Sequence, residues 1–244
     1  MNQWYKDWFN TEEYLNVYRH RNDDDAKRLV NLILSEIPLS GNARVLDLAC
    51  GAGRHSILFA EKGYRVTAVD LSENLLTVAK KSADTAHVKA DFVQCDLRYF
   101  SVSAKFDLAV NLFTSFGYFV EDRENFKVFD VSYEHLNPGG YFVLDFFNRN
   151  YLEENLIHET VEESSGETIV QRRSIVDNRV IKKITILKDG NEKQYHESVR
   201  MYGRDELIKA ITGCGYEIKN LFGDFEGNIF DPDKSNRIII IARK

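Results

Sequence analysis

One short stretch of the sequence places acids and glycines in an order that suits the binding of a nucleoside. The segment "VLDLACGAGRHSILFAEKGYRVTAVDLS", residues 45–72, contains Asp47, Gly51, Gly53 and Asp70. Glycines between a strand and a helix let the backbone approach a ligand, and the start of the helix offers unpaired N–H groups. An acid at the end of the next strand accepts hydrogen bonds from a ribose diol. In the structural alternative, the glycines only shape a turn and Asp70 only caps the helix that begins at "SENLL".

Asp47 and Ser56 distinguish between two kinds of nucleotide ligand. A carboxylate just before the turn would repel a pyrophosphate, whereas it would attract an ammonium or sulfonium group. Ser56 occupies a position where the dinucleotide fingerprint prefers glycine or alanine. Both residues therefore favour adenosine with a cationic side group over a nicotinamide dinucleotide.

The elements that must position these residues alternate between helices and strands. Residues 23–37 repeat apolar side chains at helical spacing, and residues 44–48 are typical of a buried strand. From there to residue 148, short apolar runs alternate with helical stretches. This alternation predicts a parallel sheet that helices cover on both faces.

The pattern changes after residue 148. Residues 158–203 read as alternating strands, and the turn signals "VDNRV" and "LKDGNEK" predict antiparallel hairpins. A helix at "GRDELIKAITGCGY" and a buried strand at "RIIIIARK" then return to the main sheet. We therefore predict an N-terminal aromatic segment over 1–22, a Rossmann-like domain over 23–150 and 203–244, and a small antiparallel β insert over 151–202.

Five motifs occur in the order and at the spacing of a known family. "VLDLACGAG" (45–53) and "VTAVD" (66–70) resemble the first two motifs of the class I S-adenosylmethionine-dependent methyltransferases. Further along, "FVQCDLRYF" resembles the third motif, "FDLAVNLFTSFGYF" the fourth strand with its loop, and "LNPGGYFVLDFFN" the fifth strand. The resemblance covers about residues 24–148 and 203–244. We therefore expect an α/β fold with a doubly wound, mostly parallel seven-stranded sheet, helices on both faces and the β insert.

The resemblance implies that the protein binds S-adenosylmethionine and transfers its methyl group. Asp70 would hold the ribose, the third-motif acid Asp96 would approach the adenine, and Asn111 would lie beside the cofactor. Tyr18 corresponds to a tyrosine that often touches the methionine end of the cofactor in relatives, and Ala49 conservatively replaces a frequent glycine. The cofactor-binding residues implied in this way are Tyr18, Asp47, Ala49, Gly51, Gly53, Asp70, Leu71, Asp96, Leu97 and Asn111.

Methyl transfer needs alignment of donor and acceptor more than it needs a dedicated catalytic residue. An acceptor that is a hydroxyl or a protonated amine also requires a general base. His20, His55 and Tyr118 are the candidates for such a base. Each has a structural alternative: a helix cap for His20, the start of a helix for His55 and plain packing for Tyr118. No catalytic residue is therefore assigned.

Aromatic residues crowd the N-terminal segment before the first core helix. We expect them to form a lid over the cofactor and the acceptor, and the alternative is that they cover the edge of the sheet. The residues concerned are Trp4, Tyr5, Trp8, Phe9, Tyr14 and Tyr18.

The insert is the predicted site of acceptor recognition, because it follows the fifth strand near the crevice where open α/β sheets bind ligands. Its basic residues suit either a face for an anionic acceptor or the solvated side of a sheet, and their alternation with apolar and acidic residues favours the solvated side. Alternation along the last strand places His196 and Arg200 on one face and Glu197 on the other. The basic residues are Arg172, Arg173, Arg179, Lys182 and Lys183.

Composition argues against several other classes of protein. The formal net charge of −6 lacks the basic footprint of a nucleic-acid-binding protein. Cys50, Cys95 and Cys214 show neither zinc-site nor disulfide spacing, so we predict no metal and a cytoplasmic location, and Cys50 is interpreted as a small buried residue. No apolar run approaches the ~20 residues of a membrane span, and the N-terminus does not resemble a signal peptide.

These observations together predict a methyltransferase that acts on an O or N nucleophile of a small molecule, as a monomer or a homodimer. The fourth strand is followed by "NLFTSF" rather than an "NPPY"-like tetrapeptide, and no Pro-Cys dipeptide marks a pyrimidine-carbon methylase. Protein or RNA acceptors therefore rank behind a small molecule. A nicotinamide-dependent oxidoreductase and a noncatalytic cofactor-binding module remain as alternatives, and the acceptor itself is not identified.

Overall fold

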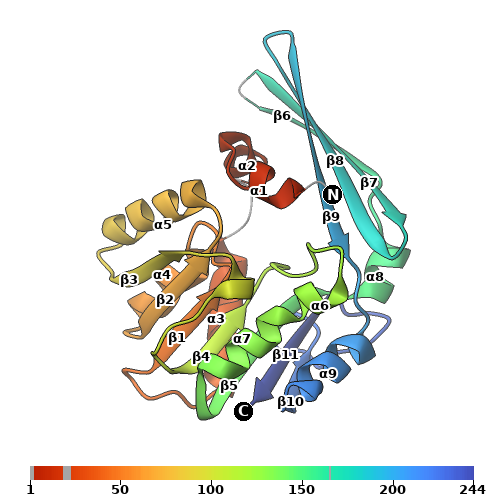
Figure 1. The fold of residues 1–244 in the computed structure, drawn as a ribbon. Coiled ribbons are helices and arrows are strands. Elements are labelled where there is room, and N and C mark those ends of the chain that lie inside the picture. The colour runs from red at the N-terminus through yellow and green to blue at the C-terminus, as the bar shows by residue number, and fades with distance from the viewer. Residues whose placement is uncertain (1–2, 19–22, 165) are drawn as a thin grey trace.

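The computed structural model describes residues 3–18, 23–164 and 166–244, and contains two β-sheets (Figure 1). In the larger sheet β11 runs antiparallel to both of its neighbours, and the other strands pair in parallel. The predicted α/β class and the mostly parallel seven-stranded sheet are confirmed. Its strands, in spatial order, are β10 (Glu217–Phe222), β11 (Arg237–Arg243), β5 (Leu136–Phe147), β4 (Phe106–Asn111), β1 (Arg44–Leu48), β2 (Arg65–Asp70) and β3 (Ala90–Gln94).

Helices cover both faces of this sheet because successive strand residues point to opposite sides. Val45 packs into a core with α3 (Asp23–Glu36), α4 (Arg54–Glu61) and α5 (Glu73–Thr85). Leu46 and Leu48 pack into a second core with α7 (Lys127–His135) and α9 (Arg204–Gly213). Shorter elements are η1 (Leu97–Tyr99), α6 (Asp122–Asn125) and α8 (Arg149–Glu154). None of the helices in the described segments has the length and apolar character needed to cross a bilayer.

The smaller sheet is an antiparallel meander within the predicted insert. Two of its hairpins turn at Asp177–Asn178 and Asp189–Gly190, where all four residues have positive φ angles, between 49° and 76°. Two-residue turns of this handedness match the twist of antiparallel strands, and Asp, Asn and Gly adopt them most readily. The strands, in order, are β6 (Glu159–Ser164), β7 (Glu167–Val176), β8 (Arg179–Lys188) and β9 (Asn191–Arg200).

The N-terminal segment forms two short helices, α1 (Trp4–Trp8) and α2 (Glu12–Val17), between the insert and the carboxyl ends of the larger sheet (Figure 1). Trp8 is only 1% exposed, and it belongs to a third core with Ile169 and Ile184 of the insert. The described part of the segment, residues 3–18, therefore packs against the insert rather than along the edge of the larger sheet (Figure 1). It bridges the two sheets above the carboxyl ends of the parallel strands.

Candidate functional site

Buried polar side chains gather where neighbouring parallel strands end. Asp47, Asp70, Asn111 and Asp145 lie at or near the carboxyl ends of β1, β2, β4 and β5, and each is less than 9% exposed. The chain reverses direction across the sheet between β1 and β4, because β2 and β3 extend to one side and β4 and β5 to the other. Open α/β sheets bind ligands at such a switch point.

The two glycines of the turn after β1 have different structural roles. Gly51 has a φ of +56°, and a Cβ added there would meet no atom within 4 Å, so its surface is open. Gly53 has a φ of +79°, and an added Cβ would lie 2.8 Å from the Cβ of Ala79 in α5. Gly51 therefore leaves room for a ligand, whereas Gly53 allows α4 and α5 to pack closely. Ala49 also adopts a positive φ of 62°, a conformation that costs a non-glycine residue about 1 kcal/mol, so its replacement of glycine is not conservative for the backbone.

The carboxylate of Asp70 is held by two backbone groups. Its Oδ2 accepts a hydrogen bond from Gly51 N, and its Oδ1 accepts one from Ser72 N, each at 2.8 Å. Burial raises the pKa of Asp70, and these hydrogen bonds oppose the rise. A carboxylate has about four acceptor positions, so about two remain for a ligand.

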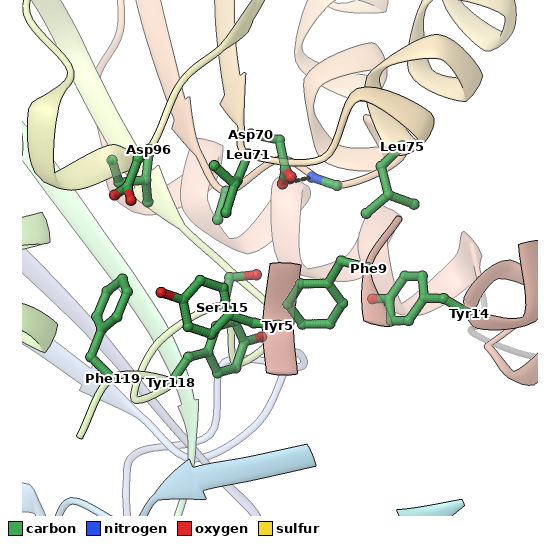
Figure 2. Close-up of a pocket in the computed structure, with 13 residues that line it drawn as sticks. Tyr5, Phe9, Tyr14, Asp70, Leu71, Leu75, Asp96, Ser115, Tyr118 and Phe119 are labelled. Atoms are coloured by element: carbon green, nitrogen blue, oxygen red, sulfur yellow. Dashed lines mark hydrogen bonds between the residues drawn. The ribbon is translucent and has the colours of Figure 1, made fainter. Parts of the chain in front are cut away.

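Asp70 lines a pocket with two distinct walls (Figure 2). One wall carries Asp70, Leu71, Leu75 and Asp96 from the ends of β2 and β3 and the start of α5. The opposite wall is a row of aromatic rings from the N-terminal segment and from the loop after β4. We call this cavity the adenosine pocket; its remaining lining residues are Tyr5, Phe9, Tyr14, Ala49, Gly51, Leu97, Ser115, Tyr118 and Phe119.

Asp96 contributes a fixed negative charge to the adenosine pocket. The guanidinium of Arg98 donates to both of its carboxylate oxygens, at 3.0 and 2.6 Å. Burial alone would raise the pKa of Asp96, but the hydrogen bonds from Arg98 outweigh burial and lower it. The same guanidinium lies 4.3 Å from the centroid of the Phe119 ring, so it links the two walls.

Two further cavities share Tyr14 with the adenosine pocket. The methionine-side cavity, of about 240 Å³, is lined by Gly51, His55 and Tyr18 among others. The acceptor-side cavity, of about 320 Å³, lies between the larger sheet and the insert, and Tyr18 and Glu197 are among its lining residues. The two cavities are named after the ligand groups that we expect them to bind.

Glu197 is the carboxylate that lines the acceptor-side cavity. It accepts hydrogen bonds from Trp8 Nε1 at 2.8 Å and from the hydroxyl of Tyr18 at 2.5 Å, and it pairs with Lys182 at 3.1 Å. Burial alone would raise the pKa of Glu197, but the Lys182 ammonium and these hydrogen bonds outweigh burial and lower it. The sequence indicated that Glu197 faces away from His196, and His196 indeed lines a different cavity.

Three of the predicted cofactor-binding residues line none of these three cavities. Gly53 packs against α5, as described above. Asp47 is 2% exposed and accepts a hydrogen bond from the Ser56 hydroxyl at 2.5 Å, and burial raises its pKa to about 7. Asn111 is fully buried, and its amide donates to Leu48 O at 2.8 Å and Ser115 O at 3.1 Å. A direct contact of these residues with the cofactor stays a prediction.

Two of the three candidates for a general base lie in the described part of the chain, and each also lines at least one of the cavities. His55 lies in the first turn of α4, as expected, with its ring 4.8 Å from that of Phe113. The Tyr118 hydroxyl donates to Thr114 O at 2.9 Å. His20 lies outside the described residues. Cys50 is 8% exposed and burial raises its thiol pKa, which agrees with its interpretation as a small buried residue.

The basic residues of the insert divide between the two sides of the sheet, and the preference for the solvated side was wrong for some of them. Lys182 and Arg173 line the acceptor-side cavity, and Arg179 donates to the loop after β4. Arg172 and Lys183 are exposed. Alternating polarity does not reveal that the N-terminal segment and the loop after β4 cover part of this sheet.

Sequence reasoning missed Asp145 and Arg237. Asp145 accepts a hydrogen bond from Phe113 N at 2.8 Å and pairs with Arg237 at 2.7 Å. Phe113 and Thr114 both have positive φ angles, 53° and 61°, which is unusual for such side chains and typical of strained functional loops. The one available signal was an acid inside the apolar strand "YFVLDFFN", which predicts a buried partner.

The described residues fit the adenosyl group that the resemblance implies. The open space beside Gly51 and the acceptor positions of Asp70 suit a ribose, and the aromatic wall suits a purine. Asn111 Oδ1 is buried and has no hydrogen-bond partner within the described residues. Such acceptors are rare in folded proteins, although Asn111 itself lines none of the three cavities.

Known structures and families agree with this geometry. A solved S-adenosylmethionine-dependent methyltransferase from Clostridium acetobutylicum ATCC 824 has a TM-score of 0.83 at 21% sequence identity, covering 95% of this chain and 97% of that chain. A methyltransferase-domain family matches residues 45–140, which include the glycine turn. Residues 45–140 therefore form a methyltransferase domain, and the chain has the class I methyltransferase fold. This finding replaces the nicotinamide-dependent alternative.

Two curated relatives of the methyltransferase match most of its length. The glycine/sarcosine N-methyltransferase of Halorhodospira halochloris is 25% identical over 236 residues, which cover 91% of this chain and 86% of that protein. The dTDP-3-amino-3,4,6-trideoxy-alpha-D-glucopyranose N,N-dimethyltransferase of Streptomyces venezuelae is 26% identical over 212 residues, which cover 83% of this chain and 86% of that protein.

Proposed function

We propose that the methyltransferase uses S-adenosylmethionine to methylate the nitrogen of a small-molecule amine. The acceptor-side cavity carries this proposal. It adjoins the adenosine pocket through Phe9, Tyr14 and Tyr118, and Glu197 lies among its aromatic rings. A cavity of about 320 Å³ suits a small molecule better than a nucleic acid. Aromatic faces beside a carboxylate attract an ammonium group.

Different residues align the cofactor and the acceptor. Asp70 accepts the ribose hydroxyls, and the aromatic wall opposite Asp96 holds the adenine. S-adenosylmethionine would supply the methyl group of its sulfonium, whose sulfur leaves with the bonding electron pair as the neutral thioether of S-adenosylhomocysteine. The chain therefore needs to orient the acceptor nitrogen, exclude water and hold the proton that the acceptor loses.

Glu197 is our candidate for orienting the acceptor. Its lowered pKa keeps it ionised at neutral pH, so it can accept hydrogen bonds from an amine. Tyr18 lines both the methionine-side and the acceptor-side cavities, and it bonds to Glu197. We therefore expect this polar pair to lie between the two ligands. The names of the two curated relatives, both of which describe N-methylation of small amines, support a nitrogen acceptor.

The test is a methylation assay with methyl-labelled S-adenosylmethionine and a panel of amino acids, amino sugars and their hydroxyl analogues, followed by a metabolite extract. We expect mass spectrometry to locate the label on nitrogen. Glu197→Gln should reduce turnover at least tenfold while S-adenosylhomocysteine affinity changes less than twofold, and Glu192→Gln, on the exposed end of β9, should change neither. A labelled oxygen, or cofactor binding without any turnover, would contradict the proposal.

We also propose a cytoplasmic location and a monomeric or homodimeric state. The cysteine spacing supports a reducing compartment. Light scattering after size-exclusion chromatography tests the oligomeric state, and a trimer or larger assembly would contradict it.

A further inference from the structure

The loop that follows β4 forms part of the aromatic wall of the adenosine pocket. Ser115, Tyr118 and Phe119 of this loop line the pocket, and Phe119 lies opposite Asp96 in Figure 2. Residues 112–121 contain no helix or strand. Contacts with neighbouring elements must therefore fix the conformation of the loop, because a segment without regular hydrogen bonding has few internal constraints.

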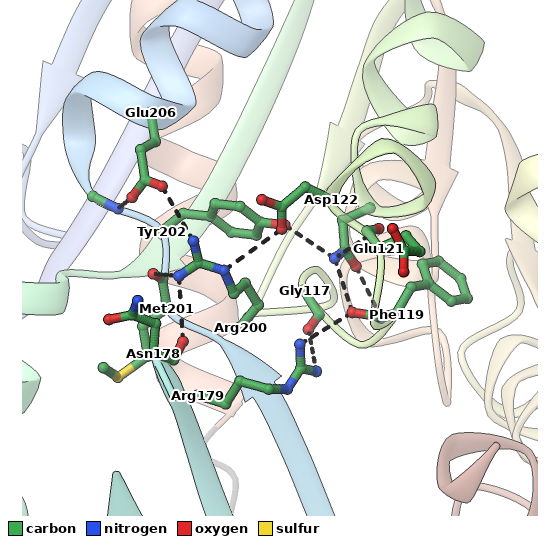
Figure 3. Close-up of polar contacts among 12 residues, drawn as sticks. Gly117, Phe119, Glu121, Asp122, Asn178, Arg179, Arg200, Met201, Tyr202 and Glu206 are labelled. Carbon is green, nitrogen blue, oxygen red and sulfur yellow. Dashed lines mark hydrogen bonds and ion pairs between the residues drawn. The ribbon is translucent and has the colours of Figure 1, made fainter. Parts of the chain in front are cut away.

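Arg179, the first residue of β8, holds this loop through its guanidinium group (Figure 3). Its Nη1 donates to Phe119 O at 3.1 Å, and its Nη2 donates to Gly117 O at 3.1 Å and Tyr118 O at 3.3 Å. The side chain is anchored within the insert, because Nε donates to Ser198 Oγ at 2.7 Å and Nη2 to Ser198 O at 2.8 Å. One side chain thus connects three consecutive carbonyl groups of the loop to two strands of the insert.

The backbones of the loop and the insert also lie in direct contact. Arg200 N in β9 donates to Gly117 O at 2.8 Å. Gly117 has a φ of +87°, and a Cβ there would lie 3.0 Å from Arg200 O, so the contact requires glycine. On the other side, Asn125 accepts from Phe119 N at 2.9 Å and donates to Phe119 O at 3.0 Å. The backbone of Phe119 is therefore held from both the insert and α6.

The chemistry of arginine suits this role. Every hydrogen bond of Arg179 in the described part of the chain goes to the loop or to Ser198, and none goes to a carboxylate. A planar guanidinium directs several N–H groups at fixed angles, whereas a lysine ammonium acts as a point charge. Only arginine can bond to three carbonyls and the anchoring serine together.

We propose that Arg179 is a positioning residue for cofactor binding: its guanidinium holds the carbonyls of residues 117–119 so that the ring of Phe119 stays in the wall of the adenosine pocket. The insert is then part of the cofactor site as well as one wall of the acceptor-side cavity. Val180 and Lys182, which line that cavity, belong to the same strand as Arg179. This inference rests on the proposed placement of adenosine.

A double-mutant cycle tests the proposal, because a residue that acts through Phe119 loses its effect when that ring is absent. The dissociation constant of S-adenosylhomocysteine is measured by calorimetry for the wild type, Arg179→Gln, Phe119→Ala and the double variant. We expect Arg179→Gln to weaken binding five- to twentyfold in the wild type and less than twofold in the Phe119→Ala background. Arg179→Lys should behave like Arg179→Gln. The matched control is Arg172→Gln, an exposed arginine of β7, which should change binding less than twofold.

The outcomes distinguish the role of Arg179 from the assignment of the cofactor site. An equal fold-change for Arg179→Gln in both backgrounds, or wild-type affinity in Arg179→Gln, would overturn the role of Arg179 and leave the methyltransferase function intact. Absence of binding to the wild type would instead overturn the placement of adenosine on which the inference rests. Circular dichroism checks that each variant is folded. If an Arg179 variant does not fold, Ser198→Ala is tested in its place, because it removes one anchor of Arg179.

Discussion

Asp70→Asn should weaken the binding of S-adenosylhomocysteine by about 10- to 100-fold. Both oxygens of Asp70 already accept backbone N–H groups, from Gly51 and Ser72, at 2.8 Å. An asparagine has only one oxygen and no negative charge, so its NH₂ group must face one of these donors, and at most one acceptor position remains for the ribose. A hydrogen bond to a charged group contributes about 1.5–3 kcal/mol. The loss of one such bond corresponds to the stated range of affinities.

The assay compares two ligands, so that a general loss of structure is recognised. Calorimetry gives the affinities of S-adenosylhomocysteine and of its 2′,3′-dideoxy analogue for the wild type and for Asp70→Asn. The wild type should discriminate between the ligands by the predicted factor, and Asp70→Asn should bind both with similar affinity. The control is Asp91→Asn, at an exposed position of β3, which should leave both affinities unchanged. If the variant loses the same factor for both ligands, the assignment of the ribose to Asp70 is refuted.

Three further predictions concern residues around the pocket. Because burial raises the pKa of Asp47 to about 7, the folded protein retains a proton that the unfolded chain loses, and the free energy of unfolding falls by up to about 1.4 kcal/mol per pH unit between about pH 4 and 7. Asp47→Asn should flatten this slope in urea titrations, and an unchanged slope would contradict the pKa assignment. Asp145→Asn leaves Arg237 without its carboxylate and should lower the free energy of unfolding by about 3 kcal/mol, measured by denaturant titration; a change below about 1 kcal/mol would contradict the buried pair. Asn10→Ala removes an acceptor of a 2.9 Å hydrogen bond from Ser72 Oγ, which attaches the N-terminal segment to the start of α5. We therefore expect S-adenosylhomocysteine to dissociate about two- to tenfold faster, as measured by stopped-flow fluorescence. An unchanged dissociation rate would contradict the role of the segment as a lid.

The order of the elements could be predicted from the sequence because each depends on local patterns. Helix α3 follows from apolar residues at helical spacing, and the hairpins of the insert follow from Asp177–Asn178 and Asp189–Gly190, which favour tight turns. The glycine turn and Asp70 were likewise recognisable, because one fixed-length strand-helix-strand unit carries them together. Local spacing alone brings Gly51 and Asp70 into contact.

Contacts between distant segments could not be predicted in the same way. Asp145 and Arg237 are 92 residues apart and meet because β5 and β11 pair antiparallel. Arg179 meets the loop after β4 only because the insert folds back over the larger sheet. The burial of a single side chain could not be predicted from the sequence either. Asp47 is expected to face the charge of the ligand, but in the structure it accepts a hydrogen bond from the Ser56 hydroxyl in the first turn of α4.

A crystal structure with bound S-adenosylhomocysteine tests the central claim most directly. We predict the ribose hydroxyls at Asp70, the adenine between the Asp96 wall and the aromatic wall, and the amino-acid end beside Gly51 in the methionine-side cavity. A ligand bound elsewhere, or an adenosine pocket that aromatic side chains close in the presence of saturating ligand, would contradict it.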